Sequence, residues 1–341
     1  MTTVYVGVDV AKAKLDGAVA WTAQERQALG QFDNNESGIG QLAKRVTKLC
    51  RAQGEVTLHL VVEPTGGYEG RLLNFAYAQG WAVTLVNPLQ VRRWAEGMGV
   101  RAKTDRVDAD VLSWYGAATA PSGQEPMEEA AQELDELLRR RTDLEQLRQA
   151  ERNRQAVAAH KPHTPAAVYQ SIERTLQALD EELSAIEEAI RQLLKQDAAL
   201  HQQVRLLRSL PGVGEKVSLP LLSLLHRFQA RTSGQGTAKQ LVAFVGLDPQ
   251  PKESGNSVYK RPTISRKGDT HMRSLLYLGA LGGKRGQILK QIYQQFLDRG
   301  KAKKVALMAC ARRILVWAWA IFRANSPFDP LRFEKTVQLA S

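Results

Sequence analysis

The chain has 341 residues, of which 43% are hydrophobic and 24% charged, so it is long enough for two or three domains with buried cores. Its two cysteines, Cys50 and Cys310, lie far apart in sequence, and neither has a partner at metal-ligand spacing. We therefore expect neither a disulfide framework nor a zinc ribbon, and a reducing cytoplasm suits the chain.

Charge is distributed unevenly along the chain. The formal net charge of +12 divides into +1 over residues 1–118, −6 over 119–200 and +17 over 201–341, where 24 Lys and Arg face 7 Asp and Glu. A basic third of this strength predicts binding to a polyanion such as nucleic acid; the alternative is a solvated basic surface.

The first third of the chain alternates strand and helix signals. Nearly all of residues 4–10 are apolar, as in a central strand, and two short strands follow as a meander. The expected elements are strands over 4–10, 15–20, 29–32, 56–62 and 81–86, with helices over 39–50 and 68–79. This order predicts an α/β layer fold with a mixed sheet over residues 1–118.

Four acidic residues of this region form a candidate metal site. Asp9 lies inside the first strand, where a charge is costly unless a cation or hydrogen bonds compensate it. Glu63 follows a strand at its carboxyl end, where open α/β sheets bind ligands. Asp105 and Asp108 share one face of an expected helix, and a cation would relieve their repulsion. Taken alone, this pair would be explained as an acidic first helical turn, but the two sheet acids favour a site for Mg²⁺ or Mn²⁺.

Residues 119–200 are expected to be helical and to mediate self-association. A linker over 119–126 precedes a helix over 128–159 and a break at 161–165. Apolar residues then repeat at spacings of four and three: Ile172, Leu176, Leu179, Leu183, Ile186, Ile190 and Leu193. This pattern is typical of a coiled-coil seam, which packs either on the preceding helix or on a second subunit, and we favour a homo-oligomer.

The basic third is expected to be mostly α-helical and to contact nucleic acid. A Pro-Gly-Val-Gly turn between two helices matches a helix-hairpin-helix motif, and the residues that would seat a DNA phosphate there are Gly212, Gly214 and Lys216. The alternative is a plain interhelical turn with a glycine cap. The apolar stretch 305–322 is interrupted by Arg312 and Arg313, so we expect a buried helix and no membrane span.

A loop expected at 247–257 contains Ser254 beside a glycine. The cations after it that we expect to contact nucleic acid are Lys260, Arg261, Arg266 and Lys267. A serine in a mobile loop beside cations could attack a phosphate, but the residue types alone indicate a turn serine.

Several short motifs occur in a characteristic order along nearly the whole chain. They are GVDVAK at 7–12 with LD at 15–16, EPTG at 63–66, VNP at 86–88, KTDRVDA at 103–109, PGVG at 211–214, FVGLDP at 244–249 and ESG at 253–255. Each is weak alone, but in this order they are specific. On these residues the chain resembles the DEDD transposases of bacterial insertion sequences, the IS one-ten type, which are bridge-RNA-guided serine recombinases.

The resemblance implies a RuvC-like, RNase-H-type domain over 1–118, a helical coiled-coil region over 119–200 and a transposase domain over 201–341. It implies that Mg²⁺ or Mn²⁺ is held by Asp9, Glu63, Asp105 and Asp108, and that Ser254 is the catalytic nucleophile. The implied partners are donor and target double-stranded DNA, a structured guide RNA, and further copies of the chain in a dimer or tetramer. The implied location is the bacterial cytoplasm, at the nucleoid.

Three other functions stay open. A metal-dependent Holliday-junction endonuclease would use the same acids with water as the nucleophile and would form no covalent intermediate. A sugar kinase or actin-like ATPase also opens with a Gly-x-Asp strand, but the sequence lacks the second phosphate loop and the glycine-rich adenosine loop that such an enzyme needs. A non-catalytic nucleic-acid-binding protein would leave DNA unchanged in the presence of Mg²⁺.

Overall fold

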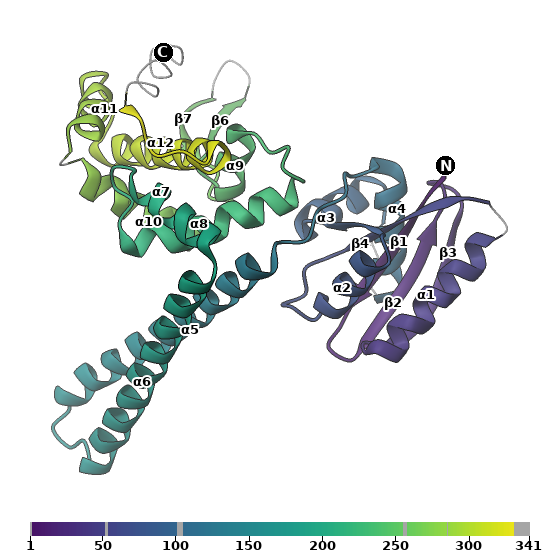
Figure 1. Cartoon of the computed structure of the whole chain (residues 1–341), viewed down its shortest axis with the longest axis horizontal. Helices are drawn as coiled ribbons and strands as arrows, with labels where there is room; N and C mark the ends of the chain where they lie inside the picture. Colours follow the sequence, from purple (N-terminus) through teal and green to yellow (C-terminus); the bar gives the residue numbers. More distant parts are fainter. Residues whose placement is uncertain (1, 52–53, 101–104, 255–257, 285, 331–341) are drawn as a thin grey trace. The chain divides into compact units, whose positions relative to one another are not determined.

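The computed structural model describes residues 2–51, 54–100, 105–254, 258–284 and 286–330, with only the backbone described for 105–107, 251–254 and 258–262. The chain forms two compact units (Figure 1). Unit 1 contains Met1–Pro126 with Ala230–Gly234, and unit 2 contains Met127–Gln229 with Gln235–Ser341. The division into domains over 1–118, 119–200 and 201–341 stays a prediction.

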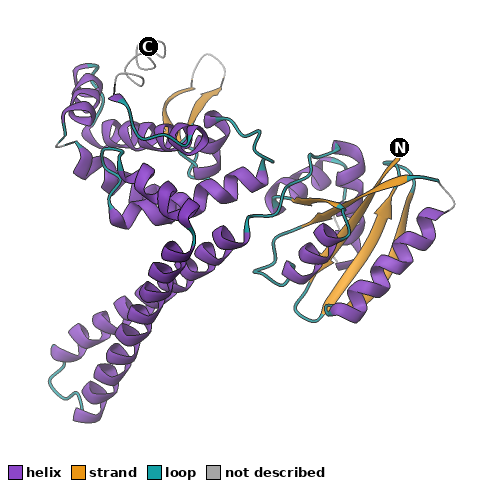
Figure 2. Cartoon of the chain, in the orientation of Figure 1, coloured by secondary structure: helices purple, strands orange, loops and turns teal. Residues whose placement is uncertain are grey.

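Unit 1 is built on a five-stranded mixed sheet, as predicted. Its strands are β1 (Thr2–Val10), β2 (Lys14–Ala20), β3 (Arg26–Asp33), β4 (Val56–Val62) and β5 (Ala82–Leu85). They lie in the order β3-β2-β1-β4-β5, in which β2 pairs antiparallel with β1 and β3, and β4 pairs parallel with β1 and β5. β1 is therefore the central strand, and the predicted meander of the first three strands is confirmed (Figure 2).

Helices pack on both faces of this sheet. They are α1 (Glu36–Cys50) and α2 (Gly70–Ala78) on one face, and α3 (Pro88–Gly97) and α4 (Asp105–Thr119) on the other. Side chains of β1 alternate between the two faces. Val4, Val6 and Val8 pack with the apolar residues of α1 and α2, whereas Tyr5 packs with those of α3 and α4. Asp9 directly follows Val8 in β1, so its side chain lies on the opposite face of the sheet, the face that α4 covers.

The sequence predicts no helix at α3, where an Asn-Pro pair is expected only to end a strand. In the structure Asn87 is the N-cap, and its Oδ1 accepts hydrogen bonds from the backbone N–H groups of Leu89 and Gln90 at 3.0 and 3.3 Å. Pro88 is the first helical residue, where its missing N–H removes no hydrogen bond. The Asn-Pro pair is thus a helix start as well as a strand end.

Unit 2 begins with a long antiparallel helix pair, α5 (Glu129–Ala159) and α6 (Ala166–Gln196), and both predicted helices are confirmed (Figure 1). The seam residues that are buried, at 3–8% exposure, are Ile172, Leu183, Ile190 and Leu193. Arg148 Nη1 lies 2.9 Å from Asp180 Oδ1 and links the two helices. Part of the predicted seam therefore packs on the preceding helix of the same chain, and the homo-oligomer stays a prediction.

The rest of unit 2 is mostly helical. Its helices are α7 (Ala198–Arg208), α8 (Glu215–Arg231), α9 (Ala238–Val245), α10 (Thr270–Gly283), α11 (Gln287–Asp298) and α12 (Lys303–Ala324). By length and composition α12 is the one described helix that could cross a membrane, but 56% of its apolar stretch is buried inside the protein. Trp317 and Trp319 are 2% and 4% exposed. They are core residues, as the sequence predicts for this stretch.

The expectation of a loop at 247–257 is wrong for residues 249–254, although 247–248 do form a loop. A two-stranded antiparallel hairpin of β6 (Pro249–Ser254) and β7 (Val258–Ile264) occupies this place. Two prolines are compatible with β6 because both strands of a two-stranded sheet are edges. The register shifts between Gln250 and Lys252, so Pro251 falls at the irregularity and not in the ladder.

Candidate functional site

Asp9 and Glu63 lie beside each other at the carboxyl end of the central strands. β1 and β4 pair in register up to Val8 and Val62, so Asp9 and Glu63 are the next two residues along. Both acids fall on the face that α4 covers, because side chains alternate along each strand and Gly7 contacts α4. Both are partly buried, on strands about 4.8 Å apart.

α4 crosses β1 at close range because Gly7 has no side chain. A Cβ on Gly7 would lie 2.3 Å from the backbone N of Ser113 and 2.4 Å from the backbone O of Ala109. One turn later, a Cβ on Gly116 would lie 2.6 Å from the ring of Tyr5. Residue numbers rise along α4 as they fall along β1, so the helix runs antiparallel to the strand.

This direction brings the first turn of α4 to the level of Asp9. Asp9 lies about 7 Å beyond Gly7 along the strand, and Asp105 lies about 6 Å before Ala109 along the helix. Asp105 is the first residue of α4, and its side chain lies outside the described residues. Asp108 follows three residues later and is partly buried. By these rises the first turn of α4 lies level with Asp9 and Glu63, while the role of the four acids as metal ligands stays a prediction.

Asp110, two residues after Asp108 on α4, forms an ion pair with β3. Its Oδ2 lies 2.8 Å from Arg26 Nη1, and the Arg26 guanidinium lies 4.4 Å from the centre of the Trp114 ring. This ion pair ties α4 to β3 and distinguishes Asp110 from the acids of the candidate site.

The structure adds a fifth acid, Asp16, that the sequence-based set lacks. Asp16 on β2 is the direct cross-strand partner of Asp9, so both side chains project from the same face. Its Oδ2 accepts a hydrogen bond from Gln31 Nε2 at 3.0 Å. The signal available in the sequence is the LD motif at 15–16, but only the strand register shows that Asp16 faces Asp9.

The donor set suits a hard divalent cation. Asp9, Glu63 and Asp108 offer carboxylate oxygens, the ligands that Mg²⁺ and Mn²⁺ prefer. Asp16 adds a further carboxylate on the face from which Asp9 projects. Among the side chains that the structure describes, no three acidic, histidine or cysteine groups form a metal-binding cluster by themselves.

Glu69 holds the turn that directly follows Glu63. Its Oε2 accepts hydrogen bonds from the backbone N–H groups of Thr65 and Gly67, at 3.0 and 2.9 Å. Thr65 Oγ1 in turn donates to the carbonyl oxygen of Glu63 at 3.1 Å. The EPTG motif is therefore a fixed turn and not a loose loop.

Asn34 joins this turn to the one that follows Asp9. Its Nδ2 donates hydrogen bonds to the carbonyl oxygens of Ala11 and Tyr68, at 2.9 and 3.0 Å. Ala11 lies two residues after Asp9, and Tyr68 lies in the turn after β4. A single side chain thus sets the spacing between the chain segments that carry two of the predicted acids.

We expect Asn34→Ala to reduce DNA strand cleavage about 10- to 100-fold and to raise the Mg²⁺ concentration for half-maximal cleavage, because groups that orient metal ligands act on metal affinity. Asn153→Ala on α5, which removes an amide hydrogen-bonded to Gln149, is the matched control and should leave both quantities unchanged. Wild-type cleavage by Asn34→Ala at every Mg²⁺ concentration would contradict this prediction.

Ser254 is the last residue of β6, and its backbone pairs with Val258 on β7. The side chains of Ser254, Lys260 and Arg261 lie outside the described residues. Arg266 and Lys267 lie in the turn after β7 and are both exposed. Ser254 therefore lies near the hairpin tip, and its catalytic role stays a prediction.

Asp248 fixes the base of this hairpin. It accepts hydrogen bonds from Ser265 Oγ and, at 2.6 Å, from Gln250 Nε2. Burial raises the pKa of Asp248, but these hydrogen bonds and the charge of Lys267 outweigh it, so its pKa lies below the ordinary value. The ionised carboxylate therefore pins the start of β6 to the end of β7, and protonation as the pH falls would loosen this tie.

The Pro-Gly-Val-Gly turn packs against α10. Gly212 has a φ of +87°, and a Cβ on it would lie 2.4 Å from the carbonyl oxygen of Gly279. This close approach explains a glycine at 212 without any ligand. Gly214 directly precedes α8, and Lys216 lies in its first turn. Contact of these residues with a phosphate stays a prediction.

Comparison with known proteins identifies the class of the chain. Residues 6–159 match a family model described as "Transposase", and residues 204–294 match one described as "Transposase IS116/IS110/IS902 family". A "Pilin gene-inverting protein" of Moraxella bovis is 29% identical over 335 residues, which cover 96% of this chain and 98% of the relative. The protein of the same name from Moraxella lacunata is 29% identical over 333 residues, which cover 96% and 98%.

A shorter match joins the chain to an insertion-element protein. The "Insertion element IS900 uncharacterized 42 kDa protein" of Mycobacterium paratuberculosis is 28% identical over 172 residues, which cover 48% of this chain and 40% of that protein. The two family models together span most of the chain, and the chain belongs to the IS110/IS116/IS902 family of transposases. It is accordingly a DNA transposase or recombinase.

Proposed function

We propose that the protein exchanges DNA strands through a covalent phosphoserine intermediate, at a site made of Asp9, Glu63, Asp105, Asp108 and Ser254. The observation that supports the proposal most is the register of β1 and β4, which sets Asp9 beside Glu63 on the sheet face that α4 covers, in a chain of a transposase family. The strand order, with three antiparallel strands followed by two parallel ones, supports an RNase-H-type domain.

The chemistry needs no nucleotide cofactor. Ser254 Oγ attacks the scissile phosphorus, so that an Oγ–P bond forms and the P–O3′ bond breaks. The hydroxyl proton of Ser254 leaves to solvent or a neighbouring base, and the departing 3′-oxygen takes up a proton to become a 3′-hydroxyl. Attack by the 3′-hydroxyl of the partner strand then reverses these bond changes, releases the serine and joins the exchanged strands.

The four acids hold Mg²⁺ or Mn²⁺ in this proposal. The ion, when bound, polarises the scissile phosphate and stabilises the charge that develops on its oxygens. The chain itself contributes the spacing of the acids, which depends on the β1–β4 register, the close packing of α4 on Gly7 and the Asn34 hydrogen bonds.

A structured guide RNA and further copies of the chain complete the proposed assembly. The +17 charge of residues 201–341 supports binding of both RNA and donor and target DNA. Base pairing by the RNA would choose the sites, so the protein needs only contacts to nucleic-acid backbones. Exposed apolar side chains on the helix pair, Leu147, Val157 and Val168, support association into a dimer or tetramer. The names of the Moraxella relatives support DNA inversion or transposition as the outcome.

The test is the covalent adduct. Full-length protein, purified with its co-expressed RNA, is incubated with donor DNA and Mg²⁺, denatured, and examined for DNA linked to protein. We expect Ser254→Ala to abolish the adduct and Ser257→Ala, a serine three residues away, to retain it. DNA cleavage by Ser254→Ala, or cleavage by the wild type without an adduct, would contradict the proposal and favour water as the nucleophile, as in a Holliday-junction endonuclease.

A further inference from the structure

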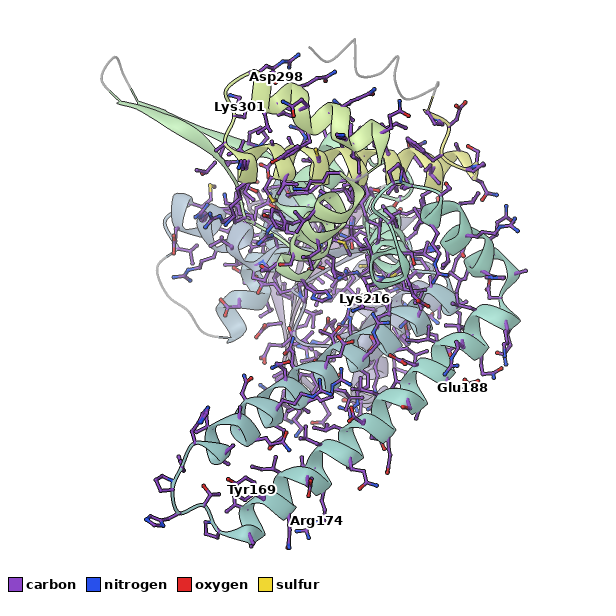
Figure 3. The ribbon with its side chains drawn as sticks, turned by 90° about the vertical axis from the view of Figure 1, so that its left-hand side faces the viewer. Tyr169, Arg174, Glu188, Lys216, Asp298 and Lys301 are labelled. Carbon is purple, nitrogen blue, oxygen red and sulfur yellow. The ribbon has the colours of Figure 1, made fainter. Side chains whose placement is uncertain are left out.

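Unit 2 contains a cavity of about 890 Å³ between the α5–α6 pair and the helices that follow it. Residues of α5, α6, α7, α8 and α10 line it. Figure 3 shows the region from the side, with Lys216 of α8 and Glu188 of α6 labelled on the helices around it. The volume lies near the upper end of the range for ligand sites, about 300–1,000 Å³.

The lining of this cavity is strongly basic. Its permanent cations are Arg141, Arg191, Lys195, Arg205, Arg208 and Lys216, and two histidines, His201 and His271, join them. The lining carboxylates are Glu145, Glu187 and Glu215. The cavity also receives the N-terminal ends of α8 and α10, at Lys216 and His271, and helix N-termini favour anions.

The three lining carboxylates compensate only part of the positive charge of the cavity's Lys and Arg side chains. Arg191 and Arg208 are the best satisfied. Arg191 Nη2 lies 3.0 Å from Glu188 Oε2, whereas Arg208 Nε donates to Ser218 Oγ at 3.2 Å and its Nη2 lies 3.8 Å from Glu215 Oε1. Lys195, Arg205 and Lys216 have no carboxylate within ion-pair distance among the described side chains. An anion entering the cavity would therefore meet cations that need not first break an ion pair.

Arg141 is the most buried of these cations. Its side chain is 17% exposed, its Nε lies 3.9 Å from Glu145 Oε1, and that Nε is buried without a hydrogen-bond partner. A buried N–H donor without a partner costs free energy that a phosphate oxygen would recover. Arg141 thus adds to the lining a partly buried cation, one of whose donors makes no hydrogen bond among the described residues.

Helix stability alone accounts for part of the pattern. Lys195 lies in the last turn of α6, and Arg205 and Arg208 lie in the last turn of α7, where cations offset the helix dipole. This does not account for Arg141 in the middle of α5 or Lys216 in the first turn of α8. Cations from four helices converge on one cavity, and that convergence needs a separate cause.

We propose that this cavity binds the phosphate backbone of a single-stranded nucleic-acid segment, a few nucleotides long, independently of its sequence. Five helices line the cavity, and its volume of about 890 Å³ suits a short single strand. No Phe, Tyr or Trp side chain lines it among the described residues, so stacking of bases on those rings does not contribute. The inference rests on the proposed nucleic-acid function, and the strand comes from a loop of the guide RNA or from opened DNA.

The test is binding without cleavage. The double variant Lys195→Gln/Arg205→Gln is compared with Lys161→Gln/Arg174→Gln, which removes the same two charges at the far end of the α5–α6 pair, where Figure 3 labels Arg174. The single variant Lys216→Gln is compared with Arg174→Gln. Fluorescence anisotropy in EDTA measures the affinity of the full chain for short single-stranded RNA, single-stranded DNA and duplex DNA over a range of salt concentrations. Thermal melting confirms that each variant is folded.

We expect the cavity double variant to bind single strands at least about tenfold more weakly than the control variant. Its slope of log affinity against log salt should fall by about 1.4, because each phosphate contact to a single strand contributes about 0.7. A loss of affinity for both single-stranded RNA and single-stranded DNA supports the proposed cavity. A larger loss for one of them also identifies the source of the strand. Affinity and slope equal to those of the control variant, or an equal loss for duplex DNA, would overturn the proposal. The adduct assay on Ser254 is unaffected by that result, so the two proposals fail separately.

Discussion

Asp9→Asn is expected to lower DNA strand cleavage by at least about 10³-fold while the chain stays folded. Asp9 lies on the central strand, beside Glu63 on one side and Asp16 on the other, with the first turn of α4 above it. An amide in this place keeps the shape of the carboxylate but removes the charge that attracts a cation. The loss should therefore appear in the chemical step and in the response to metal, and not in the fold.

Metal-dependent stabilisation provides a measurement that does not depend on cleavage. A cation that binds only the folded protein raises the melting temperature as its concentration rises. The wild type should gain thermal stability with Mn²⁺ or Mg²⁺, Asp9→Asn should gain much less, and Asp33→Asn should behave as the wild type. Asp33 is a suitable control because it is an exposed acid on β3 that pairs with Lys14. An equal metal-induced shift in Asp9→Asn and the wild type would mean that Asp9 holds no cation.

The sheet and the position of its acids could be predicted because the signals are local. A run of β-branched residues identifies β1 and β4, and a Pro-Thr-Gly-Gly break places Glu63 at a strand end. Asp16 could not be found in this way, because its role depends on pairing with Asp9 across a turn whose length sets the register. A one-residue shift would have turned Asp16 to the other face.

Other features escaped prediction because tertiary packing decides them. The β6–β7 hairpin contains three prolines, two in β6 and one in β7. Prolines usually argue against a strand, but they are tolerated here because both strands are edges. Gly212 matches a phosphate-binding turn, yet its close approach to Gly279 on α10 gives the glycine a packing role. The basic cavity is assembled from five helices, so no single stretch of sequence reveals it.

The second large effect is expected for a substitution of Gly7, a residue that has no chemical role in the proposed reaction. Gly7→Ala would place a Cβ within 2.4 Å of backbone atoms of both Ala109 and Ser113, and backbone cannot move aside as a flexible side chain can. α4 would have to shift away from β1, and overpacking of this kind costs about 1–3 kcal/mol or more. Because Asp108 is next to Ala109, the same shift would change the spacing between the α4 acids and Asp9. We therefore expect both a lower unfolding midpoint and a loss of cleavage.

Gly40→Ala is the matched control for this prediction. Gly40 lies inside α1, and a Cβ there would have no atom within 4 Å, so alanine should stabilise the helix by about 0.5–1 kcal/mol. Chemical denaturation and cleavage assays of both variants separate the effects. Cleavage by Gly7→Ala at the wild-type rate, with its unfolding midpoint lowered, would show that the α4 acids tolerate displacement and are not metal ligands. An unchanged midpoint would show that α4 does not pack on β1 as closely as the structure has it.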